Sequence, residues 1–286
     1  MGCTEGMTGT ECASPFVGRT ETWDYAPAMK AAARKFTGTE GVVVHFGDSI
    51  TFAAPYSGWA QRGAGKTPED EAILRWTHCG ERNDLDGWYL ASHPVGEYWS
   101  YTAASGIRTD QFLVGGYAGL PAFAELVRRY NPQIAVTMLG SNDAWQGRPA
   151  DEFAGEMSRV VRGLLDNGTV PILSTIPPMI PARELGDRYN AELWKLAEHL
   201  TLPVIDFHGE IVGRRPNGSW NGTILGKDDP HPTDSRVGVT PESEPTAENL
   251  RESGYLLRGW LSVKKVEEVK ERVWGGVGTS GQWRPT

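Results

Sequence analysis

The chain has 286 residues, of which 39% are hydrophobic and 22% are charged, and its formal net charge is −8. These proportions are typical of a globular protein and exclude a disordered or fibrous chain. The acidic balance and the absence of a basic stretch argue against nucleic acid as a partner. No apolar run approaches the roughly 20 residues of a membrane span.

Apolar runs and helical segments alternate along the chain. We expect helices at 26–36, 121–130, 150–168, 188–200 and 253–273, and strands at 41–46, 97–105, 133–139, 170–176 and 202–207. Pro121 stands at a plausible first helical position. The run GVVVHF (41–46) is typical of a central parallel strand that is covered on both faces. The alternation predicts an α/β protein with five parallel strands between two layers of helices.

We expect one domain over residues 25–274, with an irregular arm before it (1–24) and a flexible tail after it (275–286). Two segments, 52–96 and 208–250, interrupt the alternation, and loops of this length are usually functional.

Cys3 and Cys12 leave two alternatives open, a disulfide bridge or free thiols. Neither the compartment nor the oligomeric state is predicted, although a leader removed ahead of MGCTEG would favour secretion or the periplasm.

Ser49 follows the first expected strand, at the edge of the sheet where ligands of open α/β proteins bind. A serine hydroxyl needs a base to become a nucleophile, and His231 is the best candidate. Asp228 would orient the His231 ring, with Asp229 as the alternative that the spacing favours less. A simpler interpretation is that Ser49 caps a helix beginning at Ile50.

Acyl transfer also needs hydrogen-bond donors for the developing oxyanion. Gly106 follows the second expected strand and Asn142 the third, so both loops are expected at the same edge of the sheet as Ser49. The Gly106 and Ser49 backbone amides and the Asn142 side chain are the candidate donors. Alternatively, Gly106 serves only a turn and Asn142 only stabilises its loop.

Five blocks resemble those of the SGNH, or GDSL-type, hydrolase family, over about residues 41–265. They are GDSIT (47–51), the glycine block SGIRT (105–109), the asparagine block GSND (140–143), DDPHP (228–232), and SGYLLRGWL (253–261), which is similar to the terminal helix. The resemblance implies a flavodoxin-like three-layer α/β/α sandwich and a nucleophile at Ser49. It also implies a triad completed by Asp228 and His231, an oxyanion hole completed by Gly106 and Asn142, and no metal or organic cofactor.

The expected activity is hydrolysis of an O-acyl ester, with an acetyl group on a carbohydrate as the favoured substrate. The alternatives are a lysophospholipase or thioesterase acting on lipid acyl groups, and an inactive carbohydrate-binding protein with the same fold. Aromatic rings present flat faces that stack on sugar rings, so we expect substrate contacts from Trp145, Trp88 and Trp99, together with Arg108. A buried cluster under the first insertion would explain its aromatic residues equally well. His45 is expected to be a core histidine and not a ligand.

Overall fold

The computed structural model of the protein describes residues 17–78 and 87–275. Four parallel strands form its main sheet, in the order β1 (Val43–Gly47), β4 (Ile134–Met138), β5 (Val170–Ser174) and β6 (Val204–Ile205). Every residue of these strands is buried, as expected for a parallel sheet with helices on both faces. In the register, Gly47 lies opposite Met138, so β1 and β4 end at the same level.

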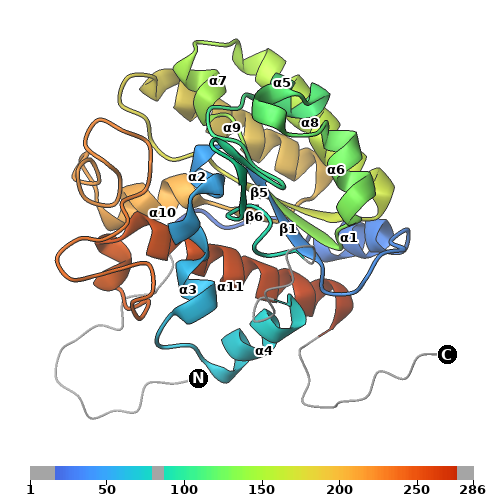
Figure 1. Ribbon diagram of the computed structural model, residues 1–286, viewed down its shortest axis with the longest axis horizontal. Helices are drawn as coiled ribbons and strands as arrows, with labels where there is room; N and C mark the ends of the chain where they lie inside the picture. Colours follow the sequence, from blue (N-terminus) through green and yellow to red (C-terminus); the bar gives the residue numbers. More distant parts are fainter. Residues whose placement is uncertain (1–16, 79–86, 276–286) are drawn as a thin grey trace.

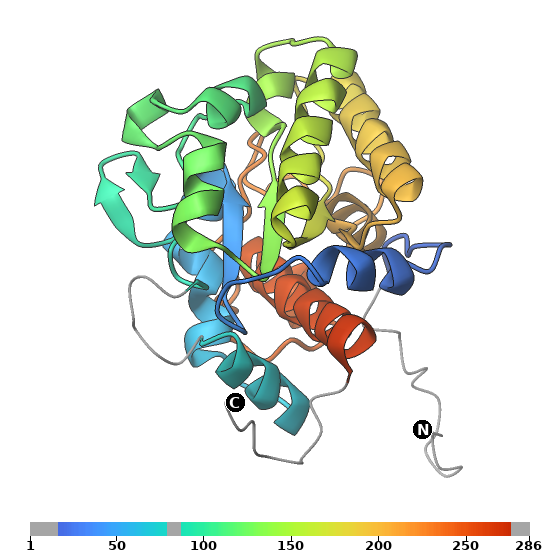
Figure 2. The same ribbon diagram turned by 90° about the vertical axis from the view of Figure 1, so that its right-hand side faces the viewer.

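Helices cover both faces of this sheet (Figures 1 and 2). One layer contains α5 (Thr109–Val114), α6 (Phe123–Tyr130), α8 (Ala150–Asn167) and α9 (Arg183–Leu200). The other contains α1 (Ala26–Ala33) and the long α11 (Gly254–Trp274), against which α3 (Gly58–Arg62), α4 (Pro68–Trp76) and α10 (Phe207–Arg214) pack. Short helices α2 (Ser49–Phe52) and α7 (Ser141–Trp145) follow β1 and β4, and the 3-10 turns are η1 (Ala54–Ser57), η2 (Tyr117–Gly119) and η3 (Asn249–Arg251). The predicted α/β/α sandwich is confirmed.

The prediction of a fifth parallel strand at 97–105 is wrong. Residues Trp99–Ser100 (β3) instead pair antiparallel with Pro94–Gly96 (β2) in a separate hairpin. The Ser100 hydroxyl oxygen accepts hydrogen bonds from the amides of Thr102 and Ala103, which folds the chain into a turn. Such local side-chain bonds compete with a strand ladder. Only one parallel bridge, between Gly47 and Ala103, remains of the expected pairing with β1.

Helix boundaries differ from the expected ones by more than one residue in three places. Helix α1 ends at Ala33, although we expected this helix to extend to residue 36. Pro121 precedes α6 and does not begin it, because the helix starts at Phe123. Helix α9 begins at Arg183, five residues earlier than expected. The prediction missed its first turn because Gly186 and Asp187 are poor helix formers. Packing overrides this weak propensity, since Gly186 lies buried beside Met179.

Buried apolar residues from Tyr25 to Val273 form a single cluster. On this basis we propose that residues 25–274 are one domain. In the arm, the amides of Val17 and Gly18 donate hydrogen bonds to Glu210 of α10. The cysteines and residues 276–286 of the tail lie outside the described residues.

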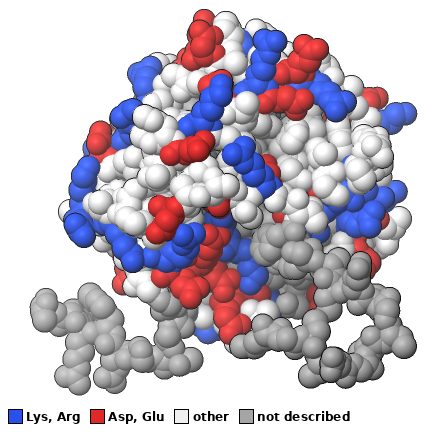
Figure 3. Space-filling model, turned by 180° about the vertical axis from the view of Figure 1, so that it is seen from behind, with Lys and Arg blue, Asp and Glu red and all other residues white. Residues whose placement is uncertain are grey.

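None of the helices in the described part of the chain combines the length and apolarity needed to cross a membrane. On the face opposite to the view of Figure 1, Lys and Arg side chains are interspersed with Asp and Glu side chains (Figure 3).

His45 lies in the centre of β1 and is completely buried. Its Nδ1 is 2.8 Å from the Tyr56 hydroxyl, which also lies 2.8 Å from Oγ of Ser262 in α11. The ring of Trp88 packs edge-on against the imidazole, with the ring centroids 4.4 Å apart. These contacts identify His45 as a core residue, as predicted.

Lowering the pH is expected to destabilise the protein through His45. The pKa of His45 is lowered from 6.5 to about 3, mainly by burial and secondly by the positive charge of Arg258. Between these values the unfolded chain binds a proton that the folded chain does not, so the free energy of unfolding falls by about 1.4 kcal/mol per pH unit as the pH drops. Urea unfolding at pH 7, 5.5 and 4.5 measures this slope. His45→Phe should have the shallower slope, and equal slopes in the two proteins would contradict the assignment.

Candidate active site

Ser49 lies at the start of α2, immediately beyond the end of β1. The buried carboxylate of Asp48 caps this helix by accepting a hydrogen bond from the amide of Ile50 at 3.0 Å. The interpretation of Ser49 as the capping residue is therefore wrong, and its hydroxyl is not used for capping. As the first helical residue, Ser49 has a backbone amide without an acceptor within the helix.

The Ser49 hydroxyl meets the ring of His231, which comes from the segment between α10 and α11. Oγ of Ser49 lies 2.8 Å from Nε2 of His231. On the other side of the ring, Nδ1 lies 2.5 Å from Oδ1 of Asp229. In the tautomer with the proton on Nδ1, this N–H donates a hydrogen bond to Asp229, and Nε2 is free to accept the proton of Ser49. The three side chains are thus arranged as nucleophile, base and orienting carboxylate.

Asp229, and not Asp228, contacts His231, which corrects the sequence-based choice. Asp228 has a left-handed backbone (φ 56°), and its carboxylate accepts a hydrogen bond from the side chain of Asn221 at 2.9 Å. Asp229 also accepts a hydrogen bond from the amide of His231 at 3.0 Å, in the turn that Asp side chains favour with the residue two positions later. This turn preference was the available signal for Asp229.

The electrostatics of Asp229 agree with this arrangement. Burial is the largest single influence and raises the pKa of its carboxyl group, but the hydrogen bonds from the His231 amide and ring, with the charge of the ring, outweigh it. The net pKa of Asp229 is lowered, so the carboxylate is ionised and can stabilise a protonated His231 ring.

Asn142 lies in α7 and Gly106 in the loop before α5, at the same edge of the sheet. The Asn142 side-chain amide donates a hydrogen bond to the carbonyl of Ile107 at 3.1 Å and lies 3.5 Å from Oδ2 of Asp48. Gly106 has φ 82°, a left-handed conformation that favours glycine, and a Cβ there would lie 2.5 Å from the Tyr117 hydroxyl oxygen. The assignment of both residues to an oxyanion hole stays a prediction.

A cavity of about 390 Å³ opens beside Ser49. It is lined by Ser49, Ile50, Ser141, Asn142, Trp145, Met179, Asp228, Asp229, Pro230 and His231. Met179 was missed in the sequence, although it lies in the loop after β5 at the edge where the other site loops meet. Ser49, His231 and Asp229 therefore face the same cavity as Asn142 of α7.

A model of the GDSL-like lipase/acylhydrolase family matches residues 45–235, the segment that contains this site. The chain belongs to this family. An arylesterase from Vibrio mimicus is 25% identical over 120 residues, which are 40% of this chain and 58% of the relative. The aligned part thus spans less than two thirds of the length of this curated relative.

Solved structures share the fold of this chain. A carbohydrate esterase family 3 protein from Talaromyces cellulolyticus is 18% identical, with a TM-score of 0.52, and the match covers 81% of this chain and 98% of that one. An acetyl esterase mutant with an acetate ion is also 18% identical, with a TM-score of 0.52 and coverage of 80% and 98%. At this identity the likeness establishes the fold alone.

The residues expected to contact substrate lie in different environments. Trp145 is 55% exposed and lines the cavity. Trp88 is buried against His45, so its assignment to substrate is wrong. Trp99 packs closely on Gly119, where an added Cβ would lie 2.9 Å from its ring. It is not among the residues that line the cavity.

Arg108 likewise does not line the cavity. Its guanidinium donates two hydrogen bonds of 2.9 Å to Asp110 and one of 2.9 Å to Gln146. Through these hydrogen bonds, the Arg108 side chain connects the start of α5 to the end of α7. The expectation of substrate contact from Arg108 is therefore not supported by its position.

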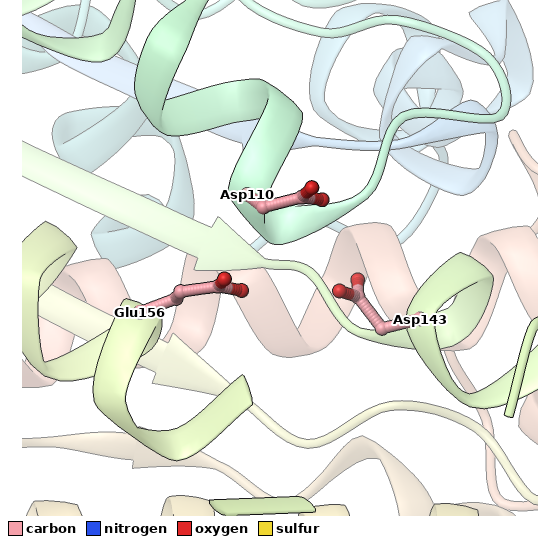
Figure 4. Close-up of side chains that lie close together, drawn as sticks. All are labelled: Asp110, Asp143 and Glu156. Atoms are coloured by element: carbon pink, nitrogen blue, oxygen red, sulfur yellow. The ribbon is translucent and has the colours of Figure 1, made fainter. Parts of the chain in front are cut away.

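The carboxylates of Asp110, Asp143 and Glu156, which come from α5, α7 and α8, lie close together (Figure 4). One oxygen of each lies within 4.8 Å of the others, a spacing that suits a metal ion. The guanidinium of Arg148 already occupies this position, with Nη1 2.5 Å from Asp143 and 2.8 Å from Glu156. The cluster is therefore an ion-pair network and gives no support for a metal.

Proposed function

We propose that this chain is a serine esterase that hydrolyses O-acyl esters, and that its substrate is an acetylated carbohydrate. The observation that carries the proposal is the series of contacts from Ser49 through His231 to Asp229 at the wall of a cavity. The His231 side chain is 45% exposed, so an ester in the cavity can reach the reacting atoms.

In the first half of the proposed reaction, Oγ of Ser49 attacks the ester carbonyl while Nε2 of His231 takes its proton. Asp229 holds the ring and stabilises its positive charge. The oxyanion accepts hydrogen bonds from the amides of Ser49 and Gly106 and from the side chain of Asn142. The tetrahedral intermediate then collapses, the C–O bond to the alcohol breaks, and His231 donates its proton to the departing oxygen.

In the second half, water attacks the acyl group on Ser49 while His231 accepts a proton from the water. The new tetrahedral intermediate collapses to the free carboxylic acid. His231 returns the proton to Oγ of Ser49, which restores the enzyme. The same donors serve both oxyanions, so a single site supports both steps.

Trp145 supports a sugar as the alcohol part of the substrate. Its exposed ring borders the cavity on one side and, on the other, an open groove of about 830 Å³ that runs along Ile180 and Arg183. A flat apolar face next to polar side chains is the combination that stacks on sugar rings. Two structural neighbours carry the names carbohydrate esterase and acetyl esterase, and we extend these substrate classes to this chain as part of the proposal.

Replacing Trp145 by alanine is expected to raise KM for an acetylated oligosaccharide about tenfold, which corresponds to a loss of about 1.4 kcal/mol of binding. The kcat for this substrate and both constants for a small aryl acetate should change little, because the ring contacts only the sugar. Steady-state kinetics on the two substrates measures the difference.

Trp76→Ala is the matched control. Trp76 lies in α4, where its indole donates a hydrogen bond to Glu40, three residues ahead of β1 and therefore at the opposite edge of the sheet. An equal rise of KM in both variants, or an unchanged KM in Trp145→Ala, would refute the sugar contact.

A longer acyl ester is the second candidate, because Ile180, Pro181 and Leu185 give the same groove apolar walls. Acetyl, butyryl and octanoyl esters of one phenol separate the two. A kcat/KM that falls along this series supports the acetyl esterase, and one that rises supports a lipid acyl hydrolase.

A further inference from the structure

Arg148 lies between α7 and α8 and joins three helices through an ion-pair network, which we call the Arg148 cluster. Its guanidinium pairs with Asp143 of α7 at 2.5 Å, with Glu156 of α8 at 2.8 Å and with Asp110 of α5 at 3.5 Å. A fourth carboxylate, Glu152, lies at 3.3 Å. The Arg148 side chain is 16% exposed and that of Asp143 is fully buried, so solvent screens their interaction weakly.

Asp143 connects this cluster to both candidate oxyanion loops. One of its oxygens accepts hydrogen bonds from the amide and the hydroxyl of Thr109, both at 3.0 Å. Thr109 is three residues beyond Gly106, and Asp143 directly follows Asn142. One carboxylate therefore holds the Gly106 loop and the Asn142 helix at a fixed separation.

The position of this carboxylate depends on its partners. Burial is the main influence on Asp143 and raises its pKa, while Thr109 and Arg148 act in the opposite direction. Without the guanidinium of Arg148, the buried charge of Asp143 would lie beside the carboxylates of Asp110 and Glu156, and Arg108, which pairs with Asp110, would be the cation left next to them. These groups would then repel one another or take up protons.

We propose that Arg148, acting through Asp143, is a positioning residue that sets the separation of the Gly106 and Asn142 oxyanion donors. This inference rests on the proposed function, because it concerns the geometry of the same reaction. Oxyanion donors act mainly in the transition state, so a displaced donor lowers kcat more than it changes KM. Arg148 itself is not among the residues that line the cavity.

The cluster has a second consequence. The three carboxylates shown in Figure 4 have the spacing of a cation site that the guanidinium fills. Removing the guanidinium should therefore leave an oxygen-lined site that accepts a hard divalent cation such as Ca²⁺. A bound Ca²⁺ would restore the missing positive charge and draw Asp110, Asp143 and Glu156 together again.

The test compares Arg148→Met with Arg214→Met, in a short-chain aryl acetate assay on protein shown to be folded by circular dichroism. Arg214 forms a buried ion pair with Glu210 in α10, at 2.7 Å, and neither residue lines the cavity. We expect Arg148→Met to lower kcat about 100-fold with KM nearly unchanged. Arg214→Met should keep the wild-type kcat, and millimolar Ca²⁺ should raise kcat in Arg148→Met alone.

Thr109→Val provides a milder variant in case Arg148→Met does not fold. It removes one hydrogen bond to Asp143 and leaves the cluster intact, and we expect kcat to fall about tenfold at unchanged KM. A wild-type kcat in folded Arg148→Met and in Thr109→Val, or an equal loss in Arg214→Met, would overturn the inference. An inactive Ser49→Ala beside a fully active Arg148→Met would leave the proposed function standing and remove only this inference.

Discussion

Replacing Ser49 by alanine is expected to lower kcat for an aryl acetate by about 10⁴- to 10⁶-fold. The reason is that Oγ of Ser49 lies 2.8 Å from Nε2 of His231, which is placed to deprotonate it, and no other hydroxyl of the described residues has a hydrogen bond to this ring. Initial rates with purified protein measure the loss. Alanine is a good helix former, so α2 should persist and the melting temperature should stay close to that of the wild type.

Ser57→Ala is a suitable control for this substitution. Ser57 is buried at the end of η1, where its hydroxyl lies 3.0 Å from that of Ser92, and it does not line the cavity. Its loss should leave kcat within about threefold of the wild type. Equal rates in wild type and Ser49→Ala would remove Ser49 from the mechanism.

Asparagine at position 229 is expected to lower kcat by about 10⁴-fold, whereas Asp228→Asn should change it only a few-fold. The carboxylate of Asp229 accepts from Nδ1 of His231 and so keeps Nε2 available as a base. An amide at this position can donate to Nδ1, which favours the tautomer with the proton on Nε2. It also removes the negative charge that stabilises the protonated ring. Steady-state kinetics on an aryl acetate measures both variants.

Asp228 is a matched comparison because it is the same residue type, adjacent in the chain and at the same cavity. Its carboxylate and amide both bond to Asn221, so asparagine there should perturb only the turn. A larger loss in Asp228→Asn than in Asp229→Asn would restore the original assignment from the sequence spacing and contradict the observed geometry.

The layers of the fold were predictable because they depend on local patterns. Continuous apolar runs located all four strands of the main sheet, and helical composition or periodicity located α1, α6, α8, α9 and α11. The expected strand at 97–105 failed because the Ser100 hydroxyl bonds to the next backbone amides and turns the chain. Its composition is that of a strand, and only the local side-chain bonds reveal the turn.

That Ser49, His231 and Asn142 lie at one cavity was predictable, because each follows a recognisable element or motif. The choice between Asp228 and Asp229 depended on which carboxylate the turn directs at the ring, which sequence spacing does not determine. Trp88 was misassigned because an aromatic residue in a long insertion gives no sign of whether it is buried. Arg148 was missed because its role depends on carboxylates from separate helices.

Covalent capture of Ser49 is the most direct test of the central claim that this serine is the nucleophile activated by His231. The protein is treated with a fluorophosphonate, and the site of attachment is located by mass spectrometry of its peptides. The account predicts one adduct, on Ser49, with loss of esterase activity in proportion to labelling and no adduct in Ser49→Ala. Undiminished labelling of Ser49→Ala, or attachment at another residue with the same loss of activity, would contradict it.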